Sequence, residues 1–212
     1  MMEQSIRIIK ADVGTFLIKS ICFLSFLLIF YDQKKDSGLN AYAIKNDRFR
    51  QFHFYNRKQI PVLCYHNVTK NSRKEDILWI SEANLNEQLK MLHDSGYQTI
   101  LPDQLYEYIS GRTALPAKSI LISFDDTHEE HFSIAAPVLR RYGFKAVFFS
   151  MTVCIGKKNF MTAAQIKILS HSGHVIGGHT WNHPAITTLK DKEWELQLIN
   201  QNYFWKKLPK SL

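Results

Sequence analysis

Apolar and polar residues follow two different periods along residues 60–207, and the switches between them predict a mixed α/β domain. Short apolar runs of strand length, such as residues 119–124, alternate with longer segments in which apolar residues recur at helical spacing, such as residues 82–94. Strands that alternate with helices form a parallel sheet, either a barrel or a doubly wound layer. The predicted strands are 61–65, 97–101, 119–124, 145–150 and 174–178, and the predicted helices are 82–94, 102–111, 128–142, 162–172 and 191–207.

The first 31 residues differ from the rest of the chain. An apolar run from Ile21 to Tyr31 follows a basic region that contains Arg7, Lys10 and Lys19. A basic region before a short apolar core is typical of an export signal. The run is shorter than the roughly 20 residues that span a bilayer, and extending it back to a spanning length would bury Lys19. We therefore expect either a cleaved signal peptide or an uncleaved membrane anchor.

This pattern divides the chain into three expected parts. Residues 1–31 are the targeting segment, residues 32–59 are a polar, basic linker, and residues 60–212 are the α/β domain. The protein is accordingly expected to be exported, and either anchored in the bacterial membrane through its N-terminal segment or secreted to the periplasm or cell surface.

Charge and cysteine content narrow the classes of partner. Lys and Arg number 27 against 19 Asp and Glu, a formal net charge of +8, which suits anionic surfaces. No nucleic-acid-binding motif accompanies this charge, so we expect no nucleic-acid partner. Cys22, Cys64 and Cys154 show no paired spacing, and we interpret them as small buried apolar residues.

Titratable residues follow three of the predicted strands at the point where each strand ends. His66 follows residues 61–65, Asp125 and Asp126 follow residues 119–124, and His179 and His183 follow residues 174–178. Each has an ordinary explanation: a loop histidine, a helix N-cap, or two exposed histidines one helical turn apart. Since carboxyl ends of parallel strands meet at one edge of a sheet, all of them together predict a functional site there.

The chemistry of these side chains is that of a metal-dependent hydrolase. Two imidazoles and one carboxylate make a three-ligand site for zinc or a similar divalent ion, with positions left open for water and substrate. The ion lowers the pKa of a bound water from about 15.7 toward 7. A second carboxylate can accept the proton of that water, and a further histidine can protonate a leaving amine.

Two motifs carry a family resemblance. Ser123-Phe124-Asp125-Asp126 resembles the first motif of the polysaccharide deacetylase family, also called the NodB-homology or carbohydrate esterase family 4 domain, and residues 177–184 (Gly-Gly-His-Thr-Trp-Asn-His-Pro) resemble its second motif. The resemblance implies a distorted (β/α) barrel in which Asp125 is the catalytic base. It implies Asp126, His179 and His183 as ligands of a divalent metal, for which zinc fits and cobalt, nickel, manganese or iron are alternatives.

The opening strand resembles one branch of this family. Tyr65-His66 is similar to the arrangement in deacetylases of poly-N-acetylglucosamine, where the acid histidine lies on the first strand. That resemblance implies His66 as the catalytic acid and an acetylated glucosamine polymer as substrate. Peptidoglycan, chitin oligomers and small N-acyl compounds stay open as alternatives.

Two departures from the family pattern affect these expectations. Thr127 stands where the first motif normally continues with glycine. The chain also ends at Leu212 before the family's third motif and after five strand–helix units, so we expect a barrel that is incomplete at its C-terminus. The alternative functions are a catalytically impaired remnant that binds metal or glycan without turnover, and a membrane-tethered structural protein in which the His/Asp cluster is incidental.

Overall fold

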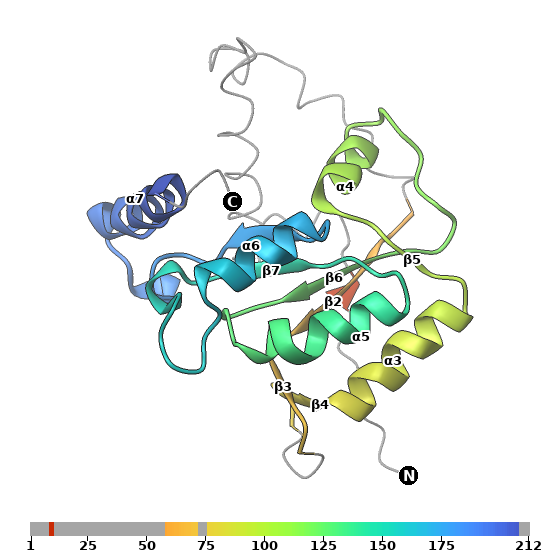
Figure 1. Ribbon diagram of the computed structural model, residues 1–212. Coiled ribbons are helices and arrows are strands. Elements are labelled where there is room, and N and C mark those ends of the chain that lie inside the picture. Colours follow the sequence, from red (N-terminus) through yellow and green to blue (C-terminus); the bar gives the residue numbers. More distant parts are fainter. Residues whose placement is uncertain (1–8, 11–57, 72–75, 208–212) are drawn as a thin grey trace.

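A mixed sheet forms the centre of the domain (Figure 1). The computed structural model describes residues 9–10, 58–71 and 76–207. In the sheet, β2, β6, β7 and β8 pair in parallel in that order, β1 pairs antiparallel with β2, and β5 pairs in parallel with β6. The strands are β1 (Ile9–Lys10), β2 (Pro61–Tyr65), β5 (Gln98–Thr99), β6 (Ser119–Phe124), β7 (Val147–Ser150) and β8 (Val175–Gly178). A separate parallel pair joins β3 (Asn67–Thr69) to β4 (Trp79–Ser81).

The central strand β6 is buried at every position because both of its faces are covered. On one face, Ile122 and Phe124 pack with Phe148 of β7 and with residues of α3, α5 and α6. On the other, Leu121 packs with Val147 and Phe149 and with residues of α4. Successive side chains of β6 and β7 alternate between these two clusters, because neighbouring residues of a strand point to opposite faces of the sheet. The sheet is thus the middle of three layers.

The helices begin and end where local signals predict. Ser81 accepts a hydrogen bond from the Asn84 amide at the start of α3, and Thr162 and Gln165 form a reciprocal capping box at the start of α6. The helices are α3 (Glu82–Asp94), α4 (Pro102–Ile109), the π-turn η5 (His131–Ala135), α5 (Ala136–Arg141), the 3₁₀ turns η6 (Thr152–Cys154) and η7 (Ile186–Thr188), α6 (Ala163–His171) and α7 (Asp191–Lys207).

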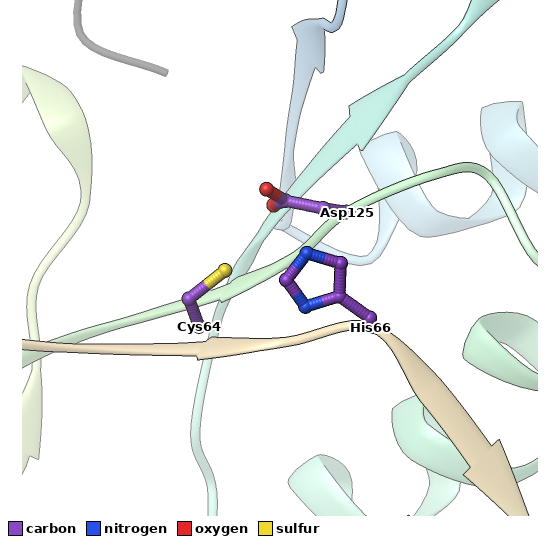
Figure 2. Close-up of side chains that lie close together, drawn as sticks. All are labelled: Cys64, His66 and Asp125. Atoms are coloured by element: carbon purple, nitrogen blue, oxygen red, sulfur yellow. The ribbon is translucent and has the colours of Figure 1, made fainter. Parts of the chain in front are cut away.

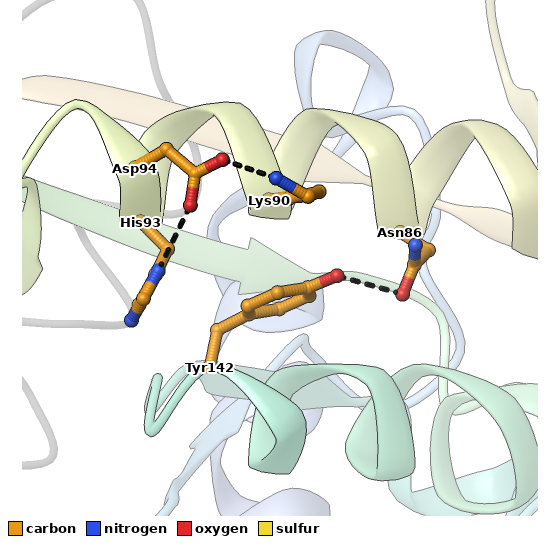
Figure 3. Close-up of polar contacts among 5 residues, drawn as sticks. All are labelled: Asn86, Lys90, His93, Asp94 and Tyr142. Atoms are coloured by element: carbon orange, nitrogen blue, oxygen red, sulfur yellow. Dashed lines mark hydrogen bonds and ion pairs between the residues drawn. The ribbon is translucent and has the colours of Figure 1, made fainter.

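Polar contacts hold α3 against the end of α5 (Figure 3). The Tyr142 hydroxyl donates to Asn86 Oδ1 at 2.9 Å, and the ring of Tyr142 lies 5.6 Å from that of His93. Along α3, Asp94 forms an ion pair with Lys90 and lies 3.3 Å from Nδ1 of His93. These exposed ion pairs contribute little stability, so the apolar faces of α3 and α5 carry the packing.

The predicted elements are confirmed with small changes of boundary. Residues 61–65, 82–94, 119–124 and 191–207 form elements with the predicted bounds. The prediction of a helix over residues 128–142 is wrong at its N-terminal end. The helical segment begins at residue 131, as a π-turn, because residue 128 makes a β-bridge to residue 160. The two short strands β3 and β4 were not predicted, because three residues are too few to show a period.

The parallel α/β architecture is confirmed, while closure into a barrel is not observed among the described residues. Within residues 58–71 and 76–207, β8 pairs only with β7. Apart from Ile9–Lys10, the predicted targeting segment and nearly all of the predicted linker lie outside the described residues. Among the helices that are described, none combines the length and the apolar character needed to cross a bilayer.

Candidate metal centre and active site

Three strand ends meet at one edge of the sheet, as the sequence predicts. The amide of Asp125, just after β6, donates to the Tyr65 carbonyl of β2 at 2.9 Å. The amide of His179, just after β8, donates to the Ser150 carbonyl of β7 at 3.0 Å. These bonds extend the sheet's hydrogen-bond ladder one residue beyond each strand, so the site residues are held by the backbone of the core.

Asp126, His179 and His183 form a compact triad. One ligand atom from each residue lies within 4.8 Å of the other two, and Nε2 of His179 is 3.4 Å from Oδ1 of Asp126. The rings of His179 and His183 lie 4.4 Å apart between centroids. His179 is buried, Asp126 is half-buried and His183 is exposed, so the triad opens toward solvent on one side. The structure therefore brings together the three residues that the sequence predicts as metal ligands.

The His-x-x-x-His segment is a loop and not a helical turn. Thr180 and His183 both adopt positive φ angles, of 62° and 54°, and the His183 amide donates to the Thr180 hydroxyl at 3.0 Å. Gln197 of α7 accepts hydrogen bonds from the amides of Trp181 and Asn182 at 3.0 and 3.3 Å. Because this loop folds back on itself, both imidazoles reach the same point, and the interpretation as two exposed helical residues is wrong.

The triad has the electrostatics of a cation site. Burial opposes ionisation of Asp126, but the His179 ring, whose Nε2 lies 3.4 Å from the carboxylate, and the charges of His66 and His183 outweigh burial and lower the pKa of Asp126. Both ring nitrogens of His179 are buried and have no hydrogen-bond partner among the described residues. A buried imidazole without such a partner is costly. A divalent ion beside Asp126 would satisfy one of these nitrogens, so the donor set fits a zinc-like ion.

Asp125 lies between the triad and a second set of side chains. It is 3% exposed, and its Oδ2 is 4.0 Å from Nε2 of His179. Its carboxylate, a ring nitrogen of His66 and Sγ of Cys64 lie within 4.8 Å of one another, and Figure 2 shows the three side chains converging. The two carboxylates thus have different neighbours. Asp126 lies beside both histidines of the triad, whereas Asp125 lies between His179 and His66.

A buried histidine supports the backbone of His66. Nε2 of His131 lies 2.5 Å from the carbonyl oxygen of His66 and donates to it. His131 is fully buried, and burial lowers its pKa to about 4, so the ring is neutral at neutral pH. The neutral ring must carry its proton on Nε2 to make this bond, since a carbonyl only accepts. His131 therefore fixes the position of the backbone at His66, just after the end of β2.

Thr127 occupies a position that favours glycine. Its φ is 68° and that of Asp126 is 80°, in the left-handed region that β-branched residues avoid. The Thr127 side chain is fully buried, and its hydroxyl accepts a hydrogen bond from the Met151 amide at 2.7 Å. This bond, which glycine could not make, offsets part of the strain and ties the first motif to the end of β7.

Sequence reasoning missed three residues that shape this site. Cys64 was interpreted as a small apolar residue, although its spacing of two from His66 on a strand puts both on one face. His131 is a lone histidine in a helical pattern, and no local signal points to its partner. Gln197 is distant in sequence from the loop that it holds.

The fold and the site define the class: a parallel α/β domain with a two-histidine, one-carboxylate cation triad, a buried second carboxylate beside it and a further histidine on the opening strand. Residues 112–208 match the family model described as polysaccharide deacetylase. Over residues 112–208 the chain matches the polysaccharide deacetylase domain of the NodB type, as the resemblance of its motifs predicts.

Similar proteins support this assignment. The YxkH protein of Bacillus subtilis, whose name assigns it to the polysaccharide deacetylases, is 28% identical over 168 residues, which cover 79% of this chain and 56% of YxkH. Poly-β-1,6-N-acetyl-D-glucosamine N-deacetylase of Escherichia coli is 24% identical over 159 residues, which cover 67% of this chain and 24% of that protein. The chain thus spans between about a quarter and somewhat over half of these two relatives.

Solved structures share the fold. The Streptococcus pyogenes deacetylase PplD, solved in complex with acetate, superimposes with a TM-score of 0.64 at 24% identity. The superposition covers 70% of this chain and 69% of PplD. It supports the parallel α/β architecture described above.

Proposed function

We propose that this protein is a metal-dependent hydrolase that removes N-acetyl groups from polysaccharide containing N-acetylglucosamine. The observation that carries the proposal is the placement of Asp125, which lies 4.0 Å from His179 of the cation triad and within 4.8 Å of both His66 and Cys64. A cation site, a carboxylate and an imidazole in one place are the groups that hydrolysis of an acetamide needs.

Each side chain has a role in this proposal. Asp126, His179 and His183 would hold the divalent ion, and zinc fits their nitrogen and oxygen donors. The ion supplies Lewis acidity and makes a water molecule that it binds more acidic. Asp125 accepts the proton of the attacking water. His66 donates a proton to the sugar nitrogen as the carbon–nitrogen bond breaks, so acetate and a free amine are the products.

The positions of the two proton-transfer groups support these roles. Asp125 and His66 lie at the ends of adjacent parallel strands, which the Asp125–Tyr65 backbone bond holds together. His131 donates a hydrogen bond to the His66 carbonyl and so fixes the backbone there. Both groups are therefore positioned by the core, and the substrate needs only to place its acetamide between them.

The substrate class rests on similarity and on chemistry. The E. coli relative is named for its action on poly-β-1,6-N-acetyl-D-glucosamine. The acid histidine on the opening strand, and not in a later motif, is consistent with that branch. The proposal includes export or membrane anchoring by residues 1–31, as the basic region before the apolar run predicts.

Acetate release tests this function. The full chain, loaded with one equivalent of Zn²⁺ or Co²⁺, is incubated with partly acetylated poly-β-1,6-glucosamine, and free acetate is measured beside an Asp125→Asn variant. We expect release by the wild type and a loss of about a hundredfold to ten-thousandfold in Asp125→Asn, the usual contribution of general base catalysis.

Metal content separates this function from its alternative. We expect Asp125→Asn to keep its metal, because the triad does not include Asp125. Chain that is folded and metal-loaded but releases no acetate would contradict the enzyme proposal and support a remnant that binds metal or glycan without turnover.

A further inference from the structure

A second group of donor atoms adjoins the cation triad. Sγ of Cys64, a ring nitrogen of His66 and a carboxylate oxygen of Asp125 lie within 4.8 Å of one another. Figure 2 shows the side chains of Cys64 and His66 on the same side of their strand, both directed toward Asp125. Thiolate, imidazole and carboxylate together are ligands that zinc and cadmium prefer over magnesium or calcium.

The backbone arranges these donors before any cation arrives. Cys64 pairs with Ser123 in the parallel register of β2 and β6, and the Asp125 amide bonds to the carbonyl of Tyr65. Cys64 and His66 are two residues apart on extended chain and so share a face. Around tetrahedral zinc such donors lie about 3.3–3.6 Å apart. From separations of at most 4.8 Å, the donor atoms need to close by at most about 1.5 Å to reach this geometry.

We infer that Cys64, His66 and Asp125 form a second cation site, specific for thiophilic divalent ions such as Zn²⁺, whose occupation inhibits the enzyme. The inhibitory role rests on the proposed function, because the site would engage the carboxylate that accepts a proton and the imidazole that donates one. Neither group can transfer protons while it is a metal ligand. Binding of the ion to this site is a separate matter and does not depend on turnover.

The thiol makes this site weaker than the triad. Cys64 shares hydrogen bonds with Ser123 and Asp125, and burial together with the charge of Asp125 raises the pKa of the thiol to about 12. An ion that binds here displaces the thiol proton, which leaves to solvent, and the new sulfur–metal bond replaces the sulfur–hydrogen bond. The triad carries no such proton to displace, so the triad fills first and the second site fills when the ion is in excess.

Cobalt titration of the full chain tests the binding. Co²⁺ bound to a thiolate gives a near-ultraviolet charge-transfer band, whereas Co²⁺ held by imidazole and carboxylate alone does not. We expect two Co²⁺ ions per wild-type chain, with the band growing only during the second binding event. Cys64→Ser and Cys64→Ala should bind one ion and show no band. Cys22→Ser and Cys154→Ser are the matched controls and should keep both ions and the band.

For each variant, acetate release at excess Zn²⁺ is divided by the release of the same variant at one equivalent of Zn²⁺. This ratio measures the inhibition. The concentration of Zn²⁺ that halves activity should rise about tenfold or more in Cys64→Ser, because losing a ligand weakens metal binding at least as much as losing a hydrogen-bonded partner of a ligand, which costs about 10–100-fold. Excess Mg²⁺ should not inhibit the wild type.

The outcomes distinguish this site from the proposed function. His183→Ala, which removes a triad ligand, should keep the charge-transfer band, so the second site is detectable even in a protein without turnover. One Co²⁺ per wild-type chain, or a band that survives both Cys64 variants, would overturn the inference. So would zinc inhibition of the same strength in Cys64→Ser and in the wild type.

Discussion

His174, the residue just before β8, makes the stability of the domain depend on pH. The side chain is 6% exposed, and its Nδ1 accepts a hydrogen bond from the Ala146 amide of the neighbouring strand segment at 3.1 Å. Its ring also meets that of Phe148 edge-on at 5.2 Å. Burial and the charge of Lys145 lower the pKa of His174 to about 4. Protonation would remove the acceptor and place a charge beside Lys145, so the folded state holds the neutral ring.

The sign and size of the effect follow from linkage. The ordinary pKa of histidine is 6.5 and that of folded His174 is about 4, so between these values the unfolded chain binds the proton more readily. The stability contributed by the neutral ring is therefore complete above pH 6.5 and is lost as the pH falls toward 4. At pH 5 the loss relative to pH 8 is about 2 kcal/mol.

Urea unfolding of His174→Asn tests this reasoning. The carboxamide oxygen of asparagine can accept the Ala146 hydrogen bond but does not titrate, and the smaller side chain costs stability at every pH. Unfolding is followed by far-ultraviolet circular dichroism at pH 8 and pH 5 in the presence of a chelator, which removes the contribution of metal binding. We expect the wild type to exceed His174→Asn in stability at pH 8 and this gap to shrink by about 2 kcal/mol at pH 5.

An exposed histidine on the preceding helix provides the control. His171→Asn should show a gap to the wild type that changes little between the two pH values, because that side chain is in solvent. A gap between wild type and His174→Asn that is the same at pH 5 and pH 8 would refute the assignment of a neutral, depressed-pKa imidazole to this position.

Other perturbations address the site. A Cβ at Gly177 would lie 2.5 Å from the Phe149 ring. Gly177→Ala should therefore lower the unfolding free energy by about 1–3 kcal/mol, measured by urea unfolding. It should also weaken Co²⁺ binding at the triad, because the Phe149 ring neighbours His179. His131→Phe should lower kcat more than it changes KM, because His66 loses its backbone support, and His131→Gln, which keeps a donor, should recover part of kcat. Chelation should abolish acetate release, and one equivalent of Zn²⁺ should restore it; activity that persists without metal would contradict the role of the triad.

Much of this domain is determined by local sequence. The bounds of β2, β6, α3 and α7 agree with the predictions because each segment is long enough to show its period, and because Ser81 at the start of α3 is a strong cap. The location of the site also follows from sequence, since parallel strands place their carboxyl ends at one edge. The resemblance of the two motifs to a known family then predicts Asp126, His179 and His183 as metal ligands, and the structure brings these three side chains together.

Other features depend on contacts between segments that are distant in sequence. The bond from His131 to the carbonyl of His66 joins residues 65 positions apart, and Gln197 reaches the loop of His183 from α7. Neither segment carries a signal for the other, because these contacts exist only after the helices have packed on the sheet. The convergence of Cys64 on Asp125 likewise requires the register of β2 against β6. The sequence by itself therefore determined which side chains line the edge of the sheet, and only tertiary packing decided which of them touch.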